Sequence, residues 1–108
     1  MNQHLDQPVL VVGSCNFDLT IHADQLPGPA ETQLGGDYSA APGGKGANQA
    51  LGLHKLGSVV SFLSVVGKDH YGDQIREHLL KEGLDLSFVR VDDNMPTGLA
   101  LITLDKIG

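Results

Sequence analysis

Two largely apolar runs constrain the fold of this chain most strongly. The first is VLVV at residues 9–12, and the second is VVSFLSVV at residues 59–66. Such runs are typical of strands that are buried on both faces of a parallel sheet. A helical pattern at residues 47–56, which Gly57 can end, lies between them. The sequence therefore predicts a right-handed β-α-β unit whose first strand is central in the sheet.

A second helix and a third core strand are predicted after this unit. Apolar residues recur every four positions after Asp69, which can cap a helix that Gly83 ends. A short strand is predicted at residues 88–91. The chain ends with too few parallel strands to cover both faces of the sheet, so we expect the N-terminal part of a larger α/β protein.

Three further segments are predicted as strands outside this core. Residues 19–23 alternate between apolar and polar, which is the period of a strand with one wet face. The polar, glycine-containing residues 32–41 are expected to form a second exposed strand paired with the first. Residues 99–104 are again strand-like.

Composition excludes several classes of partner. The net charge is -6 and the seven Lys and Arg residues are scattered, which argues against a nucleic-acid partner. The single cysteine, Cys15, is expected to be a small buried residue in a reducing compartment. Residues 1–7 are polar and no apolar run is long enough for a signal peptide or a membrane span, so a cytoplasmic protein without a membrane partner is predicted. The five histidines lack close ligand spacing, and no metal site is predicted.

The segment PGGKGANQ at residues 42–49 carries the chemistry. Adjacent glycines allow positive φ and close approach to a ligand. A Walker A loop is excluded because Gly46 stands where Ser or Thr must follow Lys45, and Ser39 stands at the upstream glycine position. The dinucleotide fingerprint is excluded because Gln49 replaces its third glycine.

These residues suit a ligand with several hydroxyl groups. Asn16 and Asp18 follow the first strand, and their side-chain oxygens can accept hydrogen bonds. The amide oxygen of Asn48 can do the same. Lys45 and the backbone N–H groups near Gly44 can donate hydrogen bonds. A small sugar needs that mixture of donors and acceptors. The alternative is that the polar side chains only cap a turn and the glycines only start a helix.

Five motifs occur in an order that resembles a known family. The chain resembles the N-terminal region of the ribokinases, which are sugar kinases of the phosphofructokinase B type, and the resemblance covers nearly the whole chain. The motifs are GSCNFD at 13–18, PGPAET at 27–32, GGKGANQA at 43–50, VGKD at 66–69 with Gly72, and PTGLA at 96–100.

The resemblance implies a fold, a binding site and a dimer. Residues 1–108 would be the N-terminal part of one ribokinase-like domain, a Rossmann-like doubly wound sheet with a small β lid. The lid strands would lie within 19–23, 32–41 and 99–104, with the paired glycines as hinge, and lids of two subunits would pack together as a homodimer. The implied sugar-binding residues are Asn16, Asp18, Gly43, Gly44, Lys45, Gly46 and Asn48.

The implied reaction is ATP-dependent phosphorylation of D-ribose to ribose 5-phosphate, with Mg²⁺ and a monovalent cation such as K⁺. In the family, the catalytic aspartate, the ATP pocket and the cation site lie downstream of these residues. We therefore predict no catalytic, cofactor-binding or metal-binding residue in the chain, which alone should be inactive and should bind no cofactor. Fructokinase, deoxyribokinase or nucleoside kinase activity, or a non-catalytic sugar-binding or lid-pairing module, are the alternatives.

Overall fold

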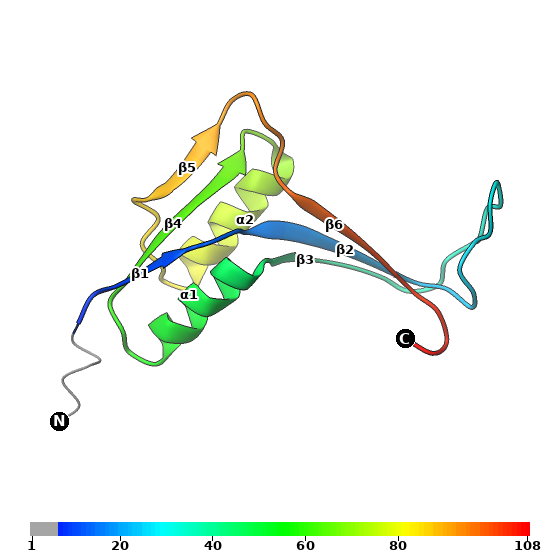
Figure 1. The fold of residues 1–108 in the computed structure, drawn as a ribbon, viewed down its shortest axis with the longest axis horizontal. Coiled ribbons are helices and arrows are strands. Elements are labelled where there is room, and N and C mark those ends of the chain that lie inside the picture. Colours follow the sequence, from blue (N-terminus) through cyan, green and yellow to red (C-terminus); the bar gives the residue numbers. More distant parts are fainter. Residues whose placement is uncertain (1–6) are drawn as a thin grey trace.

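Residues 7–108 form two helices and six strands that are divided between two sheets (Figure 1). This is a computed structural model, and most of the polar start predicted at residues 1–7 lies outside the described residues. The elements in chain order are β1 (Val9–Val12), β2 (Asn16–His22), β3 (Tyr38–Gly43), α1 (Lys45–Lys55), β4 (Val60–Gly67), α2 (His70–Lys81), β5 (Val89–Asp92) and β6 (Leu99–Leu104).

The first sheet is parallel and has the strand order β1-β4-β5. After β1 the chain forms β2 and β3 of the second sheet and then α1, which leads into β4, so the predicted β-α-β unit is present. Helix α2 connects β4 to β5. The prediction that residues 9–12 form a central strand is wrong for the described chain, because β4 is central and β1 lies at the edge. A continuous apolar run indicates how a strand is covered but not where it lies in the strand order.

The hydrophobic core lies between this sheet and the two helices (Figure 1). Phe62 and Val66 of β4 and Ile75 and Leu79 of α2 are the largest fully buried side chains. Ala47 and Ala50 of α1 are buried in the same hydrophobic cluster, and Gly46 is the third buried residue of this helix. The predicted apolar faces of both helices are thereby confirmed.

Both helices end as the sequence predicts. Gly57 and Gly83 follow them with φ of 96° and 88°, a conformation that costs glycine little. The N–H groups of the next residues, Ser58 and Leu84, donate back into the last helical turn at 3.1 Å and 3.0 Å. Neither helix within residues 7–108 is long and apolar enough to cross a membrane.

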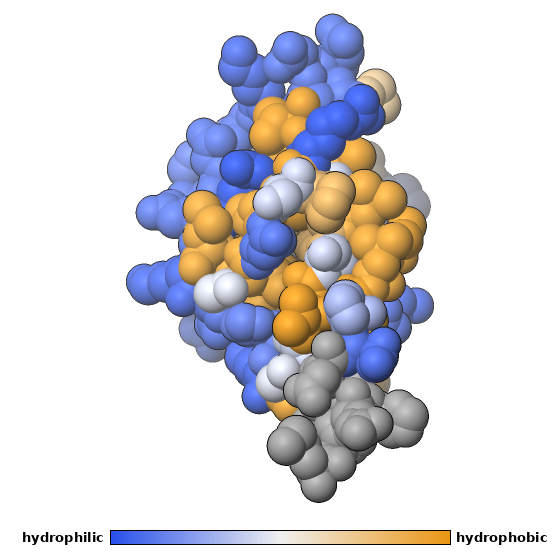
Figure 2. All heavy atoms as spheres, turned by 90° about the vertical axis from the view of Figure 1, so that its left-hand side faces the viewer, coloured by the Kyte–Doolittle hydropathy of each residue, from blue (hydrophilic) through white to orange (hydrophobic). Residues whose placement is uncertain are grey.

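The opposite face of the first sheet is apolar and uncovered within the described residues. Leu10 and Val12 of β1 are 60% and 67% exposed, and Leu63 and Val65 of β4 are 44% and 45% exposed. Val12 and Leu63 are register partners, so these side chains share one face. Figure 2 shows apolar residues gathered on this side of the molecule. Burial on both faces, which the apolar runs predicted, is therefore not seen in this part of the chain.

The second sheet has the order β3-β2-β6 and projects away from the helices (Figure 1). Strand β2 is central, antiparallel to β3 and parallel to β6. The projection makes the chain elongated, with a radius of gyration of 17.0 Å, whereas a compact domain of this length has about 13 Å. The pairing predicted between residues 19–23 and 32–41 is present, but β3 occupies Tyr38–Gly43 and residues 32–37 are irregular.

Candidate functional site

The predicted site lies where the chain passes between the two layers twice. Residues 13–15 connect β1 to β2, and Gly44 connects β3 to α1. The two crossings are in direct contact, because a Cβ on Gly46 would lie 2.7 Å from the Cα of Gly13. The N–H of Ala47 also donates to the carbonyl of Ser14 at 3.1 Å. The start of α1 is thus fixed against the turn after β1.

Asn16 and Asp18 lie on one face of β2, because they are two positions apart in a strand. The Nδ2 of Asn16 donates to the Oδ1 of Asp18 at 3.3 Å, and both residues are half-buried. The Asp18 carboxylate lies over Gly43 of β3, where an added Cβ would overlap Oδ2. A glycine at position 43 is therefore needed for this carboxylate to keep its place.

Gly44 has the backbone conformation that the paired glycines predicted. Its φ is 107°, and a Cβ there would lie 2.7 Å from the Ser14 carbonyl oxygen. It is the N-cap of α1 and has no side chain to accept a hydrogen bond, and the first turn contains no acidic residue. The N-terminus of α1 consequently carries partial positive charge without a capping side chain.

Lys45 and Asn48 belong to the first turn of α1 and are exposed. Within residues 7–108 neither side chain makes a hydrogen bond to Asn16 or Asp18. Asn48 borders a small crevice of about 10 Å³ together with Gly43 and α2 residues. The structure therefore brings Asn16, Asp18 and Gly43 into direct contact. Lys45 and Asn48 lie just after Gly43 in the chain, in the first turn of α1.

Cys15 is buried beside this site, as its expected role requires. Its Sγ lies 3.3 Å from the Oγ of Ser64 on β4. Burial raises the pKa of the thiol, and the Ser64 hydrogen bond opposes that effect in part. Cys15 thus remains a protonated, packed residue near neutral pH.

Sequence reasoning missed the part that Gly98 has in the site. Its carbonyl accepts a hydrogen bond from the N–H of Phe17 at 2.9 Å, next to Asn16 in β2. A Cβ on Gly98 would lie 3.5 Å from the Cβ of Asn16. The motif at residues 96–100 was the only signal for this contact, because the two residues lie at opposite ends of the chain.

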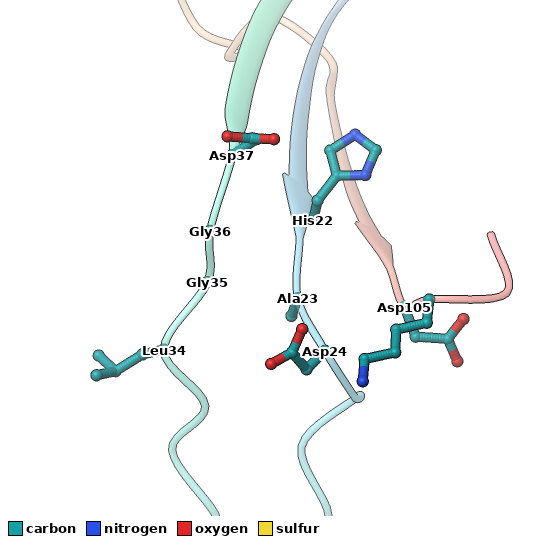
Figure 3. A pocket seen from close by; sticks show the side chains of 9 residues that line it. His22, Ala23, Asp24, Leu34, Gly35, Gly36, Asp37 and Asp105 are labelled. Carbon is teal, nitrogen blue, oxygen red and sulfur yellow. The ribbon is translucent and has the colours of Figure 1, made fainter.

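A hollow of about 520 Å³ lies elsewhere, at the far end of the second sheet. His22, Asp24, Asp37 and Asp105 border it, and Figure 3 shows His22 and Asp24 on one segment, Asp37 on a second and Asp105 on a third. Among the residues that the structure describes, no three His, Cys, Asp or Glu side chains are grouped so that they could hold a metal ion. The hollow contains none of the predicted sugar-binding residues.

Comparisons with known proteins agree on one family. A family model described as pfkB family carbohydrate kinase matches residues 6–108. The ribokinase of Bacillus subtilis is 38% identical over 96 residues, which are 89% of this chain and 33% of that protein. The chain thus spans about a third of the length of the curated relatives it matches.

Two solved structures show the same fold. The structure of Arabidopsis thaliana ribokinase complexed with ribose and ATP has a TM-score of 0.86 at 37% identity, and the match covers 95% of this chain and 34% of that one. The nucleoside kinase of Methanocaldococcus jannaschii, an archaeal member of the ribokinase family, has a TM-score of 0.84 at 26% identity, with 94% and 34% covered. The architecture is therefore shared by kinases whose names indicate different substrates.

Proposed function

Because the chain belongs to the pfkB family of carbohydrate kinases, we propose that it is the sugar-binding part of a ribokinase. Such an enzyme transfers the γ-phosphoryl group of ATP to the 5-hydroxyl of ribose. The observation that carries the proposal is the half-buried Asp18 carboxylate, which is held over Gly43 and hydrogen-bonded to Asn16. A carboxylate in this setting is a substrate ligand, and we assign it no role as catalytic base.

Sugar binding would use both side chains and backbone. One oxygen of Asp18 already accepts from Asn16, which leaves acceptor capacity for two hydroxyl groups of a sugar. Lys45 and Asn48 would contribute from the first turn of α1, and the glycines Gly43, Gly44 and Gly46 would let a ligand approach the backbone. Mixed donors and acceptors of this kind favour a ligand rich in hydroxyls over an anion or an apolar molecule.

ATP, Mg²⁺ and a monovalent cation such as K⁺ would be cofactors of the full-length enzyme. The described residues do not fit these groups. No three acidic or metal-ligating side chains within residues 7–108 are grouped for a cation, and Lys45 is followed by Gly46 where a phosphate loop needs a hydroxyl. We therefore assign no step of phosphoryl transfer to residues of this chain.

The second sheet would act as a lid over the bound sugar. It projects from the layer that carries the helices and is joined to it next to the site, at Gly44. The positive φ of Gly44 makes it a suitable hinge, because glycine samples this region at little cost. Closure of the lid would exclude water, which otherwise competes with the sugar as phosphoryl acceptor.

The kinase assignment predicts that activity depends on the rest of the enzyme. The full-length product of the gene that encodes this chain should form ADP when supplied with ribose and MgATP, while the 108-residue chain alone should form none above background. The measurement is a coupled ADP assay with ribose, fructose, deoxyribose and nucleosides as competing acceptors. Turnover by the short chain would contradict the proposal that the catalytic residues lie outside it. A preference for nucleosides would support a second candidate function, nucleoside kinase, which rests on the likeness to the archaeal nucleoside kinase.

A homodimer would form through the apolar face of the second sheet. This face carries Leu19 and Leu101, which are register partners, and Tyr38 at the end of β3. Leu101 is 77% exposed and Tyr38 is 64% exposed. Large exposed apolar side chains on one face favour burial against a second copy.

Replacing Leu101 with lysine should convert the full-length dimer to a monomer, because a charge would then have to be buried in an apolar interface. Ile102 is the matched control, since it neighbours Leu101 in β6 but lies on the opposite face. The Ile102→Lys protein should keep the wild-type mass in analytical ultracentrifugation. A Leu101→Lys protein that still sediments as a dimer would remove this face from the interface.

A further inference from the structure

The segment that leads into β6 is anchored to the first layer by two side chains. The N–H of Thr97 donates to the Oδ2 of Asp69 at 2.8 Å, and the Thr97 hydroxyl donates to Oδ1 at 2.6 Å. The same hydroxyl accepts from the N–H of Gly67, at the end of β4, at 2.9 Å. Thr97 is only 5% exposed and Asp69 is half-buried, so these bonds are partly shielded from water.

Asp69 is also the N-cap of α2, as the sequence predicts. Its Oδ1 accepts from the N–H of Gly72 at 2.8 Å. These hydrogen bonds, with the Thr97 hydroxyl first, lower the pKa of the Asp69 carboxyl. A lowered pKa means that the carboxylate stabilises the fold above its ordinary pKa near 3.8, and that this contribution is lost as the pH falls through the folded-state pKa.

The anchor is tightly packed. A Cβ on Gly67 would lie 2.6 Å from the carbonyl oxygen of Met95, and a Cβ on Gly72 would overlap the carbonyl oxygen of Gly67. Thr97 is held where the strand β4, the helix α2 and the segment before β6 meet. A helix cap alone does not need this arrangement, because Gly72 already satisfies the capping role of Asp69.

The anchor is next to the proposed sugar site. Thr97 is followed by Gly98, whose carbonyl accepts from Phe17 at 2.9 Å and which lies against Asn16. From there β6 pairs with β2 over its whole length, from Phe17 to His22. The other two crossings between the layers run through Gly13 and Gly44, whereas this third one is held by side chains.

We propose that Asp69 and Thr97 are positioning residues for the sugar site, which fix β6 and through it the part of β2 that carries Asn16 and Asp18. This inference rests on the proposed sugar-kinase function. Neither residue contacts the sugar in this scheme. Their effect is on where the ligand-binding side chains lie relative to α1.

The test uses a matched pair at position 97 in the full-length protein. Thr97→Val keeps the shape and the backbone N–H bond to Asp69 but removes the hydroxyl, so it breaks the bonds to Gly67 and to Oδ1. Thr97→Ser keeps the hydroxyl. We expect Thr97→Val to raise the KM for ribose about tenfold and to leave the KM for ATP within about twofold of wild type. Thr97→Ser should have the ribose KM of wild type.

A readout without sugar separates the anchor from the proposed function. Amide hydrogen exchange in β2 and β6, and at the Gly67 amide whose partner is removed, should become faster in Thr97→Val, while exchange in β1 and in the rest of β4 stays as in wild type. Unchanged exchange in β6, or an unchanged ribose KM with only a lower melting temperature, would overturn the positioning role. If exchange is faster in Thr97→Val than in wild type but the wild-type full-length protein does not phosphorylate ribose, the anchor is supported and the proposed function is contradicted.

Discussion

Replacing Asp18 with alanine is expected to weaken ribose binding by the full-length protein by about ten- to hundredfold. The change removes the hydrogen bonds that sugar hydroxyls would donate to the Asp18 carboxylate, and hydrogen bonds to a charged group contribute about 1.5–3 kcal/mol. The half-buried position of Asp18 favours the upper part of this range, because the carboxylate is partly shielded from solvent and already oriented by Asn16. Isothermal titration calorimetry with ribose measures the affinity directly.

Two further variants make the Asp18 result interpretable. Asp18→Asn keeps the size of the side chain and one acceptor oxygen, so its affinity should lie between those of wild type and Asp18→Ala. Asp37→Ala removes an exposed carboxylate from the far end of the same sheet (Figure 3) and should bind ribose as wild type does. A ribose affinity within about twofold of wild type for a folded Asp18→Ala protein would take Asp18 out of the site.

Gly46→Ala and Gly52→Ala are expected to change stability in opposite directions, although both replace a glycine inside α1. A Cβ at position 46 would lie 2.7 Å from both the Cα and the carbonyl carbon of Gly13. These are backbone atoms that cannot rotate away, and overpacking of this kind costs about 1–3 kcal/mol. At position 52 a Cβ would meet nothing within 4 Å, so alanine should stabilise the helix by about 0.5–1 kcal/mol.

Urea denaturation of the two full-length variants measures this difference. Since helix propensity favours alanine at both positions, a loss at position 46 is explained by the contact of the added Cβ with the backbone of Gly13 and Ser14. Gly46→Ala should also shift the start of α1 and so weaken ribose binding, whereas Gly52→Ala should leave binding unchanged. Equal stabilisation by both substitutions would show that α1 does not pack against the turn after β1 as described.

Local signals were enough to predict most elements of the fold. The apolar run at residues 9–12 and the strand at 99–104 have the predicted bounds, and Gly57 and Gly83 end the helices as expected. Each of these features depends on residues close together in the sequence. Strand order depends instead on residues far apart in the sequence, because β1 pairs with β4 and lies at the edge of the order β1-β4-β5.

The residues of the candidate site were predicted from the sequence, but the contacts between them were not. The segment 42–49 identified the glycines. Asn16 and Asp18 were predicted in the turn before a strand at 19–23, whereas they lie within β2, whose period places them on one face. That the Asp18 carboxylate lies over Gly43 follows from the register of β2 and β3, which begins with Asn16 opposite Gly43. Sequence analysis predicted β3 too early at 32–41, so this register could not be derived. The bond between Asp69 and Thr97 joins residues 28 positions apart and left no local signal beyond the helix cap.

The pairing of β2 with β6 determines the order in which the second sheet can assemble. Strands β2 and β3 are joined by one loop and can form a hairpin early, but Phe17 pairs with Leu99, which lies 82 positions later in the chain. Closing so long a loop carries a large entropic cost, and contacts of this range slow folding. Strand β2 should therefore acquire its final neighbour late, when Thr97 reaches Asp69. During synthesis the central strand of the second sheet would remain an open edge until that moment, a period in which it is exposed to pairing with other chains.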